Sequence, residues 1–230
     1  MSDTPVRTAG FLLYPNLTQL DLTGPFEVIG RLPGWKTELV AASRAPVRSD
    51  RGLVFQPDTS FAEAGDYDLF VVPGGPGTDD AMLDAATVAF IRERAQRARY
   101  VFGICTGSLL LGAAGVLRGR HAGTHWQSRD LLAKFGAIPS AARLTVDGNL
   151  FTSGGVTAGI DMALRVAAEV AGDDVAQQIQ LWIEYNPEPP FNAGSPETAP
   201  RAVVEQVVAA SAQRMAIRRA AVERAAAALG

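Results

Sequence analysis

The sequence has few of the residues on which several classes of site depend. In 230 residues it contains one cysteine, Cys105, and two histidines, His121 and His125. A single cysteine forms neither an intrachain disulfide nor a cysteine zinc cluster, and it suits a reducing, cytoplasmic setting. With no histidine after His125, a hydrolytic triad with a late histidine is also excluded.

Strong charge and long apolar runs are absent as well. The net charge is −3 with 20% charged residues, so no basic field points to nucleic acid or to an anionic membrane. The longest apolar stretch, 101–117, is too short and too glycine-broken for a membrane span, and the N-terminus shows no signal-peptide pattern. We therefore expect a cytoplasmic globular domain that binds neither nucleic acid nor membranes.

Short apolar runs alternate with helical patterns along the chain. This alternation predicts a single α/β domain, doubly wound, with a mostly parallel sheet and helices on both faces. Gly24 and Pro25 are expected to interrupt the first helix near its start. The predicted strands are 9–14, 37–42, 53–56, 68–72, 100–104, 122–124, 144–146 and 150–152, and the predicted helices are 18–32, 86–99, 107–117, 127–135, 157–171 and 175–185.

The composition changes near the C-terminus. Residues 184–200 hold five of the fourteen prolines and are interpreted as an ordered arm of a catalytic domain that spans 1–200. Residues 201–230 are rich in alanine and arginine, with a local charge of +3 from five arginines and two glutamates. We expect a helix there that packs on the domain or in a dimer, because a nucleic-acid arm would contain lysines and interleaved aromatics.

Cys105 lies in the turn between a predicted strand and a predicted helix. The layout resembles the nucleophile elbow of hydrolases, in which a sharp turn strains the backbone and exposes the side chain. The start of a helix would favour the thiolate at this position. The alternative is a small buried packing residue, as many free cysteines are.

Two further features fall where strands are predicted to end. After the strand 68–72, the glycines of Pro73-Gly74-Gly75 would let the N–H of Gly75 and the N–H of Thr106 form a pair of donors, although a simple glycine turn is the alternative. Asp21 lies among leucines after the first strand, where desolvation would raise its pKa and suit it to proton transfer. Its alternative role is that of a helix cap or of an aspartate in a loop.

The two histidines give a weaker indication. His125, in Thr124-His125-Trp126, would lie near Cys105 if the intervening helix folds back. Nothing in the sequence favours such a pair over a packed histidine at the end of a strand.

Taken together, these motifs resemble the bacterial isocyanide hydratases. That group belongs to the superfamily of the Parkinsonism-associated deglycase-like protein, the intracellular proteases and the class I glutamine amidotransferases. The resemblance covers about residues 10–200. Its motifs are QLDLTGPFEV (19–28), VVPGGPG (71–77), ICTGSLLLGAAGVLRG (104–119), THW (124–126), GGVTAGID (154–161) and EYNPEPPFNAGSP (184–196).

Departures from the other branches narrow the resemblance. Thr106 replaces the histidine that follows the cysteine in the intracellular proteases, and Asp21 stands where the deglycase-like proteins have glutamate. Regulators with this domain append a helix-turn-helix module of about a hundred residues, and only some thirty follow Pro200 here.

The resemblance implies a flavodoxin-like, glutamine-amidotransferase-like fold and a homodimer, with an isocyanide and water as substrates and no metal or organic cofactor. Cys105 would attack the isocyanide carbon to give a thioimidate, and Asp21 would supply a proton and then activate water. Thr106 would contact one of these two residues. The positioning residues would be Gly74, Gly75, Val156 and Thr157.

Two other functions remain open from the sequence. A glyoxalase- or deglycase-like enzyme that acts on α-oxoaldehydes would use the same residues. A redox or ligand sensor would use Cys105 without turnover, since a reactive cysteine serves oxidation as well as catalysis.

Overall fold

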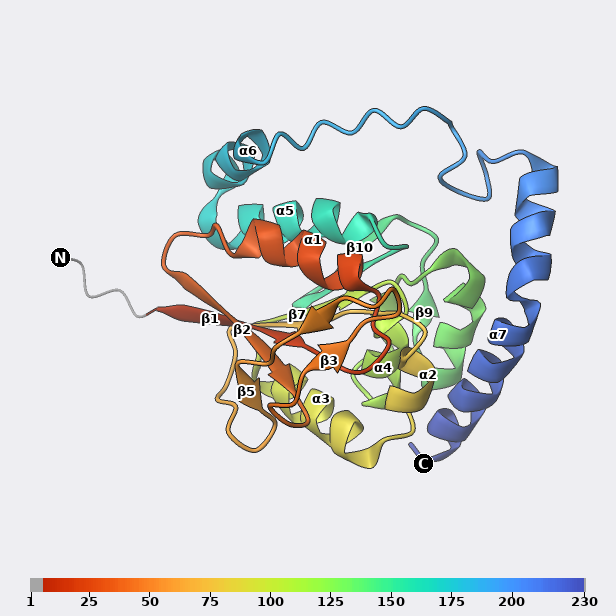
Figure 1. Ribbon diagram of the computed structural model, residues 1–230, viewed down its shortest axis with the longest axis horizontal. Coiled ribbons are helices and arrows are strands. Elements are labelled where there is room, and N and C mark those ends of the chain that lie inside the picture. Colours follow the sequence, from red (N-terminus) through yellow and green to blue (C-terminus); the bar gives the residue numbers. More distant parts are fainter. Residues whose placement is uncertain (1–5, 230) are drawn as a thin grey trace.

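A seven-stranded sheet forms the centre of the computed structural model, which describes residues 6–229 (Figure 1). All neighbouring strands are parallel except the two at one end of the sheet, which form an antiparallel hairpin. In spatial order the strands are β10 (Leu144–Asp147), β11 (Leu150–Ser153), β7 (Tyr100–Ile104), β6 (Leu69–Val72), β1 (Arg7–Leu12), β2 (Trp35–Ala41) and β5 (Thr59–Ser60). The predicted α/β fold with a mostly parallel sheet is confirmed.

Helices cover both faces of this sheet (Figure 1). The elements on one face are α1 (Gln19–Ile29), α5 (Ala158–Ala171) and α6 (Asp173–Trp182). Those on the other are α2 (Thr78–Ala81), α3 (Ala85–Arg97), α4 (Gly107–Ala113) and the 3₁₀ helix η1 (Trp126–Phe135). Two small sheets pair β3 (Val47–Arg48) with β4 (Val54–Phe55), and β8 (His121–Ala122) with β9 (Ile138–Pro139).

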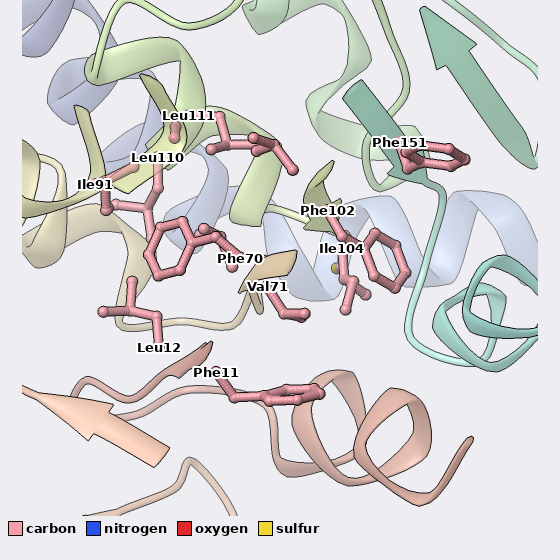
Figure 2. Close-up of a cluster of buried hydrophobic side chains, with 14 of the residues drawn as sticks. Phe11, Leu12, Phe70, Val71, Ile91, Phe102, Ile104, Leu110, Leu111 and Phe151 are labelled. Carbon is pink, nitrogen blue, oxygen red and sulfur yellow. The ribbon is translucent and has the colours of Figure 1, made fainter. Parts of the chain in front are cut away.

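Aromatic side chains fill the core on both sides of the sheet (Figure 2). The strand register aligns Phe151, Phe102, Val71 and Phe11 in one row that crosses β11, β7, β6 and β1. Phe11 packs edge-on against Phe26 of α1 at 5.1 Å, so this row faces α1 and α5. Phe70 faces the other way and packs against α3. Because side chains alternate along a strand, the strands that end at the site are buried on both faces.

The first helix differs from the prediction. It runs without a break through Gly24 and Pro25, which were expected to interrupt it. Both residues lie where α1 packs against α5. A Cβ on Gly24 would lie 2.8 Å from Ile160, and a Cβ on Gly159 would lie 3.2 Å from Pro25. The close approach of the two helices offsets the hydrogen bond that proline removes.

Other boundaries differ by a few residues. The first strand ends at Leu12, two residues before its predicted end, and α4 ends at Ala113 although the apolar pattern continues to 117. The helix predicted over 127–135 is present as the 3₁₀ helix η1, which begins one residue earlier, at Trp126. The strands β10 and β11 form a hairpin whose turn contains Gly148 at φ +57°.

The strand order places the ends of β1, β6 and β7 at one edge of the sheet. From β1, the chain continues to β2 on one side, whereas β6 lies on the other. In open α/β sheets such a switch point opens a crevice beyond the carboxyl ends of the strands. The three segments that carried candidate site residues therefore meet there.

The C-terminal part wraps around this body. Residues 184–200 form no helix or strand and run from α6 to α7 (Arg201–Ala227), as Figure 1 shows. The helix α7 packs against η1, α2 and α4. Of its arginines, Arg201 pairs with Glu205, Arg214 and Arg218 pair with Asp79, and Arg219 pairs with Asp130.

Candidate active site

Cys105 lies on a sharp turn between β7 and α4. Its φ is +52°, a left-handed conformation that costs a residue other than glycine about 1 kcal/mol or more. The backbone is held on both sides: the N–H of Cys105 donates to the carbonyl of Gly154 at 3.0 Å, and its carbonyl accepts from Thr124 Oγ1 at 2.7 Å. This is the strained turn predicted for a nucleophile elbow.

The sulfur is less accessible than such an elbow suggests. Cys105 is only 6% exposed, where the sequence led us to expect an exposed side chain. The turn packs so closely against β6 that only glycine fits at position 107, since a Cβ there would lie 2.1 Å from the carbonyl oxygen of Val72. Cys105 therefore has the strained backbone of a nucleophile elbow and also the burial of a packing residue.

Asp21 is fully buried in the first turn of α1. Its Oδ2 accepts the N–H of Gly74 at 2.9 Å, while Oδ1 has no hydrogen-bond partner among residues 6–229. The N-cap of α1 is Thr18, so Asp21 is not a helix cap. Burial raises the pKa of Asp21 to about 7, against the opposing effect of the bonds to Gly74 and the Cys105 thiol. A proton therefore exchanges at this carboxyl near neutral pH.

The predicted stabilisation of a thiolate is wrong for the resting site. The pKa of Cys105 is raised well above its usual value, first by burial and then by the charge of Asp21. The Thr106 N–H and the Arg218 guanidinium act in the opposite direction. Because α4 has only seven residues, its N-terminus cannot outweigh this desolvation. At rest, a thiol faces a carboxyl group.

The glycine turn after β6 connects Asp21 with the cysteine elbow through its two backbone N–H groups. Gly74 N–H donates to Asp21, and Gly75 N–H donates to Thr106 Oγ1 at 2.9 Å. A Cβ on Gly74 would lie 2.5 Å from the Thr106 nitrogen, so the two turns touch. The prediction that the N–H groups of Gly75 and Thr106 form a pair of donors is wrong for Gly75, because its N–H already donates to the Thr106 hydroxyl. The Thr106 N–H faces the sulfur as expected.

The Thr106 side chain does not reach either reactive group. Its hydroxyl lies 2.9 Å from Thr78 Oγ1, which in turn lies 3.3 Å from the hydroxyl of Tyr14. Tyr14 donates to the carbonyl of Pro73 at 2.6 Å. Thr106 therefore joins the two turns through its hydroxyl and contacts Cys105 through its backbone.

His125 lies near the site, but its hydrogen bond leads away from it. Nδ1 accepts the backbone N–H of Gln127 at 3.4 Å, and the ring packs over Gly155. Burial, followed by the Arg218 charge, lowers the pKa of His125 to about 4. The ring is therefore neutral at physiological pH. Its neighbour Thr124, which the sequence did not single out, is the residue of this segment that binds the elbow.

The turn after β11 contacts the elbow through the carbonyl of Gly154. Val156 is partly buried, and Thr157 is exposed and accepts from Arg143 at 3.3 Å. Thr157 is also the N-cap of α5. These residues lie beside Gly154, whose carbonyl holds Cys105, so the segment is adjacent to the elbow as the sequence suggested.

Two searches of the described structure bear on other classes of site. Within residues 6–229, no group of three or more histidine, cysteine, aspartate or glutamate side chains is placed to hold a metal ion. Over the same residues, no helix is both long and apolar enough to cross a membrane.

Comparison with known proteins places this geometry in context. Residues 7–169 match the model of the DJ-1/PfpI family. The isonitrile hydratase of Pseudomonas putida is 51% identical over 220 residues, which cover 96% of this chain and 96% of that protein. A THiJ/PfpI family protein from Pseudomonas syringae has a TM-score of 0.91 at 44% identity, covering 94% of this chain and 90% of that one. Drosophila melanogaster DJ-1beta has a TM-score of 0.70 at 23% identity, covering 77% and 97% of the two chains, which shows the fold alone.

Proposed function

Because the chain belongs to the DJ-1/PfpI family, we propose that it uses Cys105 to hydrate isocyanides, R–N≡C, to N-substituted formamides, the reaction of a lyase. The observation that carries this proposal is the 51% sequence identity to the Pseudomonas putida isonitrile hydratase, which extends over 96% of both chains. The site supports it, since a buried thiol beside a buried carboxyl group supplies a nucleophile and a proton carrier.

The raised pKa values suggest how the first step proceeds. The Asp21 carboxylate accepts the thiol proton of Cys105 as the sulfur attacks the terminal carbon of the isocyanide. The proton on Asp21 then passes to that carbon, and the product is a thioimidate, R–N=CH–S–Cys105. The thiolate exists only while it reacts, so the site need not stabilise it at rest.

The second step adds water to the thioimidate carbon. Asp21, again a carboxylate, takes a proton from the water as the water oxygen attacks, and it passes that proton to the nitrogen, which gives R–NH–CH(OH)–S–Cys105. As this adduct collapses to the formamide and its C–S bond breaks, Asp21 takes the hydroxyl proton and returns it to the departing sulfur, so the thiol and the carboxylate are both restored. Asp21 has a pKa of about 7, close to the working pH, which suits a group that both accepts and donates a proton in each cycle.

The other predicted residues are proposed as the frame of this reaction. Gly74 orients Asp21 through its N–H, and Thr106 directs its N–H at the sulfur while its hydroxyl holds Gly75. Val156 and Thr157 would border the space for the R group beside the elbow.

A homodimer is proposed from the exposed apolar surface. Leu181 and Trp182, at the end of α6, are 81% and 79% exposed, and Phe191 in the arm is 78% exposed. Large apolar side chains exposed next to each other, as Leu181 and Trp182 are, mark an interface. Symmetric pairing of this surface in a homodimer would cover these side chains and would also support the arm.

The cellular setting is proposed from the cysteine. A free cysteine suits a reducing, cytoplasmic setting.

Substitution of Trp182 tests this interface. Trp182→Glu places a charge in the proposed contact without disturbing the core, because the side chain is 79% exposed. We expect a monomer by size-exclusion chromatography with light scattering, whereas the wild-type chain and the control Val146→Glu, at a separate exposed apolar position, stay dimeric. A dimer that survives Trp182→Glu would contradict this interface.

Substrate comparison tests the function itself. The purified protein is incubated with a simple aryl isocyanide and, separately, with methylglyoxal, and formamide and lactate are quantified by chromatography. We expect formamide to accumulate with the isocyanide and no enzymatic loss of methylglyoxal. Turnover of methylglyoxal alone would instead support the glyoxalase-like alternative.

A further inference from the structure

Arg218 is the charged side chain of α7 that penetrates deepest toward the site. Its side chain is 8% exposed and forms an ion pair of 2.7 Å between Nε and Asp79 Oδ1, itself 5% exposed. Nη2 donates to the carbonyl of Gly75 at 3.1 Å, and Nη1 donates to Ser128 Oγ at 3.5 Å. A guanidinium can serve three partners at once because its donors form a rigid planar fork.

The contact with Gly75 connects this arginine to the reactive residues. The Gly75 carbonyl that Arg218 binds also accepts from Thr106 Oγ1 at 3.3 Å, and the Gly75 N–H donates to that same hydroxyl. Gly74, the preceding residue, orients Asp21. One guanidinium therefore fixes the turn that meets both the acid and the cysteine elbow.

Arg218 contributes a positive charge to the surroundings of Cys105. The ionisable groups that face Cys105 are Asp21 from α1, Tyr14 after β1 and Arg218 from α7. Arg218 is the cation among these three. Its own neighbours are Asp79, which Arg214 also contacts at 3.3 Å, and the neutral His125.

We propose that Arg218 is a positioning residue of the hydration site, which holds the Gly74–Gly75 turn against the Cys105–Thr106 elbow and places a positive charge near the reacting sulfur. The proposal rests on the function proposed above. Residue 218 lies outside the segment 7–169 that the family model matches, so α7 supplies this charge from beyond the shared domain.

Three variants separate these effects. Arg218→Lys keeps the charge but not the fork. Because Arg218→Met alone would leave Asp79 buried beside a half-exposed Arg214, the charge is removed in the double variant Asp79→Asn/Arg218→Met, in which the ion pair is lost as a unit. Arg219→Met is the matched control, since Arg219 is the next residue on α7 and makes an exposed pair with Asp130.

The single cysteine provides a readout that is independent of turnover. The alkylation rate by iodoacetamide, followed by mass spectrometry from neutral to alkaline pH, reports the pKa of Cys105 alone. In the double variant we expect this pKa to rise by about one unit. We also expect kcat with an isocyanide to fall by about ten- to a hundredfold, with little change in KM.

The other variants complete the comparison. In Arg218→Lys we expect a lowered kcat with the thiol titration of the wild type, and in Arg219→Met we expect both to stay unchanged. An unshifted alkylation profile with a normal kcat in the double variant would overturn the proposal, and so would a loss of melting temperature as the only effect. If the wild type fails to hydrate isocyanides, the proposed function falls, while the alkylation profiles still decide the role of Arg218.

Discussion

Replacement of Cys105 by alanine abolishes formamide release, because no other thiol in the chain can form the thioimidate. We expect a loss of about four orders of magnitude or more in kcat/KM, the scale seen when a covalent nucleophile is removed. The measurement is product formation by liquid chromatography over long incubations at high enzyme concentration.

Cys105→Ser provides the matched comparison. Serine keeps the size and the backbone demands of the strained position, but its hydroxyl is a far weaker nucleophile at neutral pH. We expect it to be as inactive as alanine and folded as the wild type, judged by near-ultraviolet circular dichroism and thermal melting. Substantial turnover by either variant would remove Cys105 from the chemistry.

Asp21→Asn lowers activity by about a hundred- to ten-thousandfold, the contribution of a positioned acid or base. Asparagine retains an oxygen for the Gly74 N–H, so the geometry is preserved while the proton carrier is lost. In the wild type we expect kcat/KM to rise with pH as Asp21 ionises near its pKa of about 7. In the variant this rise should be absent. A largely active Asp21→Asn enzyme would contradict the proton-transfer role.

Asp21→Asn, which lowers activity, is expected to raise the stability of the fold at alkaline pH. Because the pKa of Asp21 is raised from 3.8 to about 7, the folded state binds its proton more tightly than the unfolded state does. Its favourable contribution is complete below about pH 4 and is lost as pH rises toward 7. Above that pH the burial of a carboxylate destabilises the wild type, by an amount on the order of a few kcal/mol.

Asp21→Asn should therefore be more stable than the wild type at about pH 8.5 and lose that advantage toward about pH 4. Urea unfolding at the two pH values measures the difference. Equal free energies of unfolding at alkaline pH would show that the Asp21 carboxyl is not held against its ionisation.

Much of the site was accessible from the sequence because it depends on where strands end. The apolar run 100–104 matches β7 at both boundaries, and the small residues that follow it give the turn of Cys105. Asp21 could be singled out because a carboxylate among leucines is unusual in a chain of this composition. Parallel strands bring such segments to one edge of the sheet, so sequence order alone indicates their proximity.

The failures concern properties that arise only after packing. The sign of the pKa shift of Cys105 depends on how completely α7 and the two turns exclude water, which no local pattern records. Whether the Gly75 N–H is free depends on the rotamer of Thr106. Arg218 lay in an arginine-rich segment that was expected to pack on the domain, and nothing in that segment distinguished it from Arg219, which is exposed.

The contact of α1 with α5 at Gly24 and Gly159 has a consequence for substrate range. A Cβ on Gly159 would also lie 3.2 Å from Ile104, the residue before Cys105, while α1 carries the acid and α5 begins beside the nucleophile's turn. A larger side chain at either position would act as a spacer and alter the separation of the two reactive groups indirectly. A mutant library that samples this helix pair would therefore vary the separation of acid and nucleophile, which libraries focused on residues beside the elbow leave unchanged.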